Sequence, residues 1–107
     1  VLLNDPQFVE ASRVLATHAM QSAKEFGQRL AFISSRLLAR ELKAEEIAIV
    51  QSTYHQSLAT YKSKPAEAKS FIATGNSPVA GDLDPAELAA WTLVASQLLN
   101  LDETVTR

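Results

Sequence analysis

Two histidines and a single methionine are the residues of this 107-residue chain whose types most readily suggest cofactor chemistry. Histidine nitrogen and methionine sulfur are the usual axial ligands of haem iron in cytochromes. His18 and Met20 stand two positions apart, however, so on a helix they point to different sides. His18 instead falls in line with Ala11, Val14 and Leu15, which together with Phe8 form the predicted apolar side of the first helix. We therefore predict a partly buried structural histidine at position 18, with a ligand or catalytic role as the alternative.

His55 is the second candidate. It follows Tyr54 and lies beside the apolar stripe of its predicted helix, which places it on the surface or near a helix boundary. A zinc site built from His18 and His55 would need carboxylates from distant helices, and it would lack the closely spaced ligand pairs that mark such sites. We therefore predict no metal site and keep a functional role for His55 as an alternative.

Other reactive groups are sparse. The chain has no cysteine, which excludes disulfides, thiolate metal sites and covalent haem attachment within this segment. Asp82, Asp84 and Glu87 could offer oxygen ligands to calcium, but the segment lacks the ligand spacing of a calcium loop. No serine stands in a Gly-x-Ser-x-Gly turn. The sequence therefore predicts no catalytic residues and no cofactor.

A basic strip is the most suggestive charged feature. Arg29, Arg36, Arg40 and Lys43 follow one another at intervals of seven, four and three, which places them on one flank of a predicted helix. The strip is either a solvated face with ion pairs or a docking surface for an acidic partner. A net charge of −2 does not favour binding to the negatively charged backbone of nucleic acid, so we predict no nucleic-acid partner.

Helix boundaries can be read from proline, glycine and capping residues. Asp-Pro pairs at residues 5–6 and 84–85 predict helix starts, and Ser22 with Glu25 fits the capping-box spacing of another start. Pro65 predicts the end of the preceding helix, and Gly75 a left-handed cap. The expected helices cover residues 6–20, about 22–40, 44–62 and 65–74, and a last one begins at residue 84, after a loop over residues 76–83.

Apolar residues repeat at helical spacing within these segments. The stripes are Phe26, Leu30, Ile33 and Leu37, then Ile47, Val50, Tyr54, Leu58 and Tyr61, and finally Leu88, Trp91, Ala95, Leu98 and Leu99. Trp91 and the two tyrosines are expected to pack in the core. We predict one all-α domain over residues 1–107, an irregular antiparallel bundle of four to five helices.

The two ends of the chain carry a family resemblance. Residues 1–11 and 84–104 resemble the C-terminal PSD domain, a domain of unknown function, of planctomycete-type secreted cytochrome c proteins. Residues 40–48 stand where relatives typically carry Pro and Thr before a Glu-Glu helix start, and this chain has neither. The resemblance implies a secreted or periplasmic parent protein with an upstream haem-binding region and a further unassigned domain. It implies no established activity for this domain.

These observations predict a non-catalytic structural or protein-interaction module at the C-terminus of a large exported protein. Its expected partners are the upstream domains of the parent chain or another exported protein. Residues 1–3 are interpreted as the tail of an earlier element, exposing an apolar patch that the parent covers. The alternative is a redox or hydrolytic enzyme in which His18 or His55 completes a site formed by the upstream region. No apolar run is long enough to span a bilayer.

Overall fold

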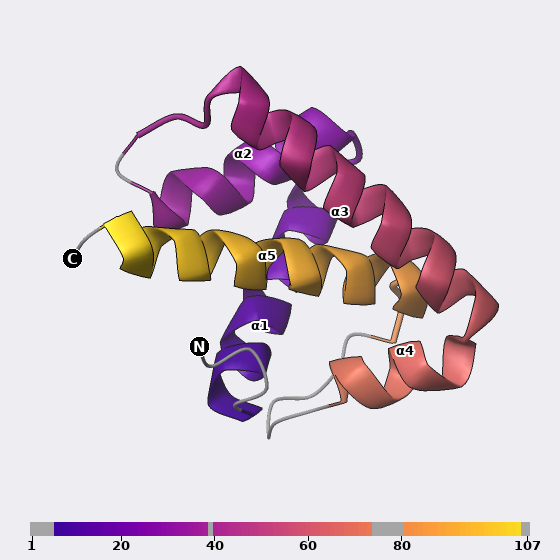
Figure 1. The fold of residues 1–107 in the computed structure, drawn as a ribbon. Helices are drawn as coiled ribbons and strands as arrows, with labels where there is room; N and C mark the ends of the chain where they lie inside the picture. Colours follow the sequence, from indigo (N-terminus) through magenta and orange to yellow (C-terminus); the bar gives the residue numbers. More distant parts are fainter. Residues whose placement is uncertain (1–5, 39, 74–80, 106–107) are drawn as a thin grey trace.

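Four α-helices surround a fifth, central one in the computed structural model, which describes residues 6–38, 40–73 and 81–105 (Figure 1). The helices are α1 (Pro6–Ser22), α2 (Phe26–Leu37), α3 (Ala44–Ser63), α4 (Pro65–Ile72) and α5 (Pro85–Val105). No strand occurs in the described ranges. The predicted all-α fold is therefore confirmed, and the number of helices is at the upper end of the prediction.

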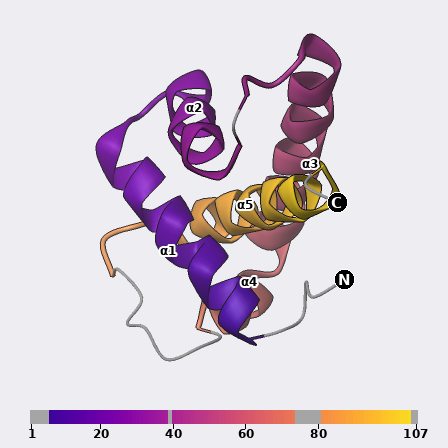
Figure 2. The ribbon, with the colours of Figure 1, turned by 90° about the vertical axis from the view of Figure 1, so that its left-hand side faces the viewer.

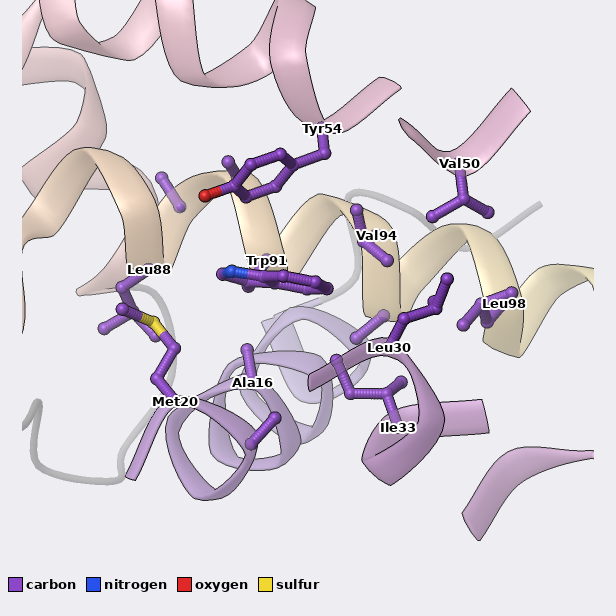
Figure 3. Close-up of a cluster of buried hydrophobic side chains, with 14 of the residues drawn as sticks. Ala16, Met20, Leu30, Ile33, Val50, Tyr54, Leu88, Trp91, Val94 and Leu98 are labelled. Atoms are coloured by element: carbon purple, nitrogen blue, oxygen red, sulfur yellow. The ribbon is translucent and has the colours of Figure 1, made fainter. Parts of the chain in front are cut away.

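The central element is α5, which all four other helices contact. In Figure 2, α1 lies on one side of α5 and α3 on the other. α2 and α3 each pack on α5, and they meet one another through aromatic side chains, with the Phe26 and Tyr54 ring centroids 5.3 Å apart. The short side chains of Ala89, Ala90 and Ala95 are fully buried, which lets neighbouring helices approach the α5 backbone from several directions. Figure 3 shows the core that results, with Trp91 between residues of α1, α2 and α3.

The buried surface of α5 is wider than the single apolar face that its sequence predicts. Thr92 and Ser96 are buried as well, and both have hydrogen-bond partners. Thr92 Oγ1 donates to the Leu88 carbonyl at 2.7 Å, and Ser96 Oγ lies 3.0 Å from Ser12 Oγ of α1. Because buried hydroxyls are costly when unpaired, these bonds allow polar residues to remain in the core.

The prediction for the buried face of α1 is wrong. The face that packs on the rest of the protein consists of Val9, Ser12, Arg13, Ala16, Ala19 and Met20. Most of the predicted face lies away from the core: Ala11 and His18 are exposed and Val14 is half-buried, while Leu15 is half-buried and packs against the edge of the core. The small side chains of Ala16 and Ala19 permit the close approach to α5 that larger residues would prevent.

The start of α2 also differs from its prediction. Ser22 is the last residue of α1, so the expected capping box at this position does not form. α2 begins at Phe26 after Glu25, which makes no side-chain cap, and it ends at Leu37 instead of near residue 40. Arg40 and Lys43 therefore belong to the connection between α2 and α3, and not to one flank of α2.

The starts of α3 and α5 are fixed by carboxylates. The Lys43 amide donates to Glu46 Oε1 at 2.8 Å, which fixes the start of α3 without Pro or Thr. The Glu87 amide donates to Asp84 Oδ2 at 3.0 Å, which confirms the predicted cap of α5. The predicted caps at Asp5 and Gly75 lie outside the described residues, as does most of the predicted loop over residues 76–83.

Aromatic residues fill the interface of α2 and α3 with α5. Trp91 is fully buried, with its ring centroid 4.8 Å from that of Tyr54 and 5.1 Å from that of Phe26. Tyr61 is half-buried and stacks on Phe71 of α4 at 5.9 Å. The expected packing role of Trp91 and Tyr54 is confirmed, while Tyr61 lies at the edge of the core.

Candidate functional site

A solvent-open depression of about 510 Å³ lies between α1 and α2. Its lining is Gln7, Glu10, Ala11, Val14, Leu15 and His18 of α1, with Arg36 and Leu37 of α2. The apolar lining exists because the buried face of α1 includes the polar residues Ser12 and Arg13, which leaves Ala11 and Val14 on the side of the depression. The floor can therefore bind apolar groups, while Glu10, His18 and Arg36 provide charged or titratable groups beside it.

His18 is exposed, in contrast to the partly buried structural histidine that the sequence predicts. It follows the same helical face as Val14, and that face is turned away from the core. It lines the depression together with Arg36 and Leu37. The structure thus brings one candidate histidine and one residue of the predicted basic strip to the same surface.

The four residues of the basic strip do not form a continuous surface on α2. The Arg29 side chain is only 14% exposed: its Nε donates to the Ala23 carbonyl at 2.8 Å, and Nη1 lies 3.9 Å from Glu87 Oε1. Arg36 Nη1 donates to the Phe32 carbonyl at 3.1 Å, and its guanidinium carbon lies 3.5 Å from the Phe32 ring centroid. Of the two, only Arg36 borders the depression.

Arg40 is held by a bidentate ion pair. Its two terminal nitrogens each lie 2.8 Å from a carboxylate oxygen of Glu46. The hydrogen bond from Arg40, together with that from the Lys43 amide, lowers the pKa of Glu46 from 4.5 to about 2. The same hydrogen bond raises the pKa of Arg40. This arrangement stabilises the start of α3, and binding of an acidic partner by Arg29, Arg36, Arg40 and Lys43 stays a prediction.

His55 lies in the middle of α3 and is exposed. Its ring stacks on Phe26 with centroids 6.4 Å apart and lies edge-on to Tyr54 at 5.4 Å. Burial raises the pKa of Tyr54, and the negative charge of Glu87 adds to the effect. The Trp91 indole nitrogen is buried without a hydrogen-bond partner among the described residues, and Figure 3 shows it on the same side as the Tyr54 hydroxyl. The rings of Phe26, Tyr54 and Trp91 contact one another, and the exposed His55 lies at the edge of this aromatic cluster.

Metal-binding geometry is not found in the described part of the chain, where no three His, Cys, Asp or Glu residues come close enough to share an ion. Asp84 accepts the Glu87 amide as a helix cap, and Asp82 is exposed beside it. No helix among the described residues is both long enough and apolar enough to cross a membrane.

A second surface was missed by sequence reasoning. The outer side of α3 exposes Ile49, the one large hydrophobic residue of the described chain that is mainly solvent-exposed, at 58%. Beside it, Leu42, Val50 and Leu98 contribute to a depression of about 370 Å³ between α3 and α5. The sequence does carry a signal for this surface, because residues 47–61 include no Asp, Glu, Lys or Arg.

Comparison with known proteins adds no relative. No family model matches the chain, and no match was found among curated proteins or solved structures. The depression between α1 and α2 and the outer side of α3 are therefore the features from which a function can be argued.

Proposed function

We propose that this domain is a non-catalytic protein-interaction module whose docking surface is the depression between α1 and α2. The orientation of α1 is the observation that carries the proposal. The helix buries Ser12 and Arg13, while Ala11 is exposed and Val14 is half-buried. An outward apolar helix face beside a second helix is typical of a site that binds another polypeptide segment.

The chemistry of the lining defines the partner. Ala11, Val14 and Leu37 offer apolar contacts, and the exposed Arg36 lies beside them. A guanidinium next to an apolar surface suits a segment that carries apolar side chains and a carboxylate. In this proposal the segment belongs to the upstream part of an exported parent protein, as the resemblance to secreted cytochrome c proteins implies.

Calorimetric titration with the upstream part of the parent chain, produced separately, tests the proposal. We expect binding, and we expect Ala11→Glu to weaken it at least tenfold because the new charge would be buried against apolar groups. Ala66→Glu places the same charge on the exposed surface of α4 and serves as the matched control. Absence of binding, or equal effects of the two substitutions, would overturn the proposal.

A catalytic role for His18 is the second candidate, because this histidine is exposed and lines the depression. In that case the upstream region supplies the remaining groups of a redox or hydrolytic site. His18→Gln would then abolish an activity of the parent protein while leaving the calorimetric affinity unchanged. An interaction module predicts the reverse, with affinity reduced by Ala11→Glu and no activity that depends on His18.

A further inference from the structure

The outer side of α3 is a long exposed surface that carries no charge between its first and last turns. Six exposed residues follow one another at alternating spacings of four and three, which places them along one seam of the helix. They are Glu45, Ile49, Ser52, Gln56, Ala59 and Ser63. Only the first carries a charge. Depletion of charged residues distinguishes the centre of a protein interface from the rest of a protein surface.

We infer that this seam, the α3 seam, is the interface of a homodimer in which α3 packs antiparallel against α3 of a second copy. The spacings between successive seam residues are four, three, four, three and four, and this order is the same in both chain directions. A two-fold axis that crosses the helix pair at the level of residue 54 therefore superimposes the seam on itself. Ile49 then faces Ala59 of the partner subunit, a large residue against a small one. Ser52 faces Gln56 of the partner subunit, and the pair can form hydrogen bonds across the axis.

Charge complementarity selects a second copy in the antiparallel arrangement. α3 has acidic residues only in its first turn and a basic residue, Lys62, in its last turn. Antiparallel packing places the exposed Glu45 of each copy beside Lys62 of its partner subunit, whereas parallel packing would place like charges together. Glu46 is already held by Arg40, so Glu45 is the carboxylate that serves this contact.

The depression beside Ile49 extends the apolar part of the interface. Leu42, Val50 and Leu98 line it, and side chains near Ala59 of the partner subunit would lie against it. One pair of helices nevertheless buries little area compared with a permanent dimer. The inferred dimer is therefore a weak and reversible one.

Sedimentation equilibrium of the full chain over a range of concentrations tests the dimer. We expect the mass to rise from 11.6 kDa toward twice that value as the concentration approaches about 1 mM. Ser52→Glu, which brings two like charges together near the axis, should weaken association at least tenfold. Ser70→Glu makes the same change on the exposed surface of α4 and should leave association unaltered.

A charge reversal tests the antiparallel register. Glu45→Lys and Lys62→Glu should each weaken association severalfold, and the double variant should recover most of the loss because the opposite pairing is restored. Circular dichroism of each variant shows that the helices remain folded. A monomer at all concentrations, equal effects of Ser52→Glu and Ser70→Glu, or a double variant weaker than both single ones would overturn the inference. Ala11→Glu, which tests the depression between α1 and α2, should leave the dimer unchanged.

Discussion

α3 and α5 are the two longest helices, with 20 and 21 residues, and each has a long central stretch without charge. α5 needs no charged face because its neighbours surround it, and Trp91 and Val94 are both fully buried. α3 buries only one side, through Val50 and Tyr54, and exposes the other. The same absence of charge thus accompanies burial of most of the uncharged stretch in one helix and an exposed surface in the other.

The difference shows that a missing polar face can have two physical causes. A helix at the centre of a fold loses its polar face because solvent does not reach it. A helix at the surface has no such reason, so a partner that removes the face from water is the simplest explanation. Substitutions in the two helices should consequently have very different effects on the isolated chain, which the following predictions use.

The largest expected contrast is between truncation of Trp91 and truncation of Ile49. Trp91→Ala removes the fully buried ring that α1, α2 and α3 surround, and should lower the free energy of unfolding by about 3–5 kcal/mol. Ile49→Ala shortens an exposed side chain and should change it by less than about 0.5 kcal/mol in the dilute monomer. Urea titration followed by circular dichroism measures both. Similar losses for the two variants would contradict the contrast between α5 and α3.

Enlarging alanine probes the same contrast in the opposite direction. Ala90 is fully buried in α5, and Ala90→Leu should cost about 1–3 kcal/mol because the added atoms have no space. Ala48 is exposed on α3. The free energy of unfolding of Ala48→Leu should therefore lie within about 0.5 kcal/mol of the value for the unsubstituted chain. Thermal unfolding of dilute samples provides the comparison. A stable Ala90→Leu variant would show that α5 is less tightly enclosed than its burial indicates.

The sequence alone predicts the fold class and most helix positions. α3 and α5 are recognised by their apolar stripes, and Asp84 is recognised as a cap. The face of α1 was mispredicted because apolar periodicity favours Val14 and Leu15, whereas packing against α5 selects the small Ala16 and Ala19. Local pattern cannot show that a neighbouring helix must approach closely.

The candidate site was harder to predict than the fold. The depression requires α1 and α2 to meet at Val14 and Leu37, which depends on tertiary arrangement. The basic strip was expected to continue along α2, but the helix ends before Arg40. Arg40 instead pairs with Glu46, six positions later. A pairing across a helix connection follows no helical spacing, so periodicity could not indicate it.

Tyr54 sharpens the contrast between the two sides of α3, because its ring lies on the buried side. Burial raises its pKa above the usual value of 10, so the folded state retains the phenolic proton more strongly than the unfolded state. The resulting stability is present below pH 10 and is lost as the pH rises through the raised pKa. Tyr54→Phe should remove this dependence in melting temperatures measured between about pH 9 and 11. An unchanged dependence would assign it to Tyr61, whose pKa burial also raises.

Glu46 gives the smallest expected effect, at the exposed start of α3. Its pKa is lowered from 4.5 to about 2 by Arg40 and the Lys43 amide, so its contribution to stability is complete above pH 4.5 and is lost as the pH falls toward 2. Melting temperatures of Glu46→Gln should therefore be lower than those of the unsubstituted chain at neutral pH and approach them in acid.

Arg40→Gln should lower the melting temperature in the same way. The double variant Arg40→Gln, Glu46→Gln should lower it little further, because both substitutions remove the same ion pair. Glu45→Gln is the matched control in the same turn, and salt should reduce only the Glu46 effect because exposed ion pairs are screened. Equal acid profiles for the variants at positions 45 and 46 would show that the bidentate pair does not stabilise the start of α3, and that this end of the helix depends on its buried side alone.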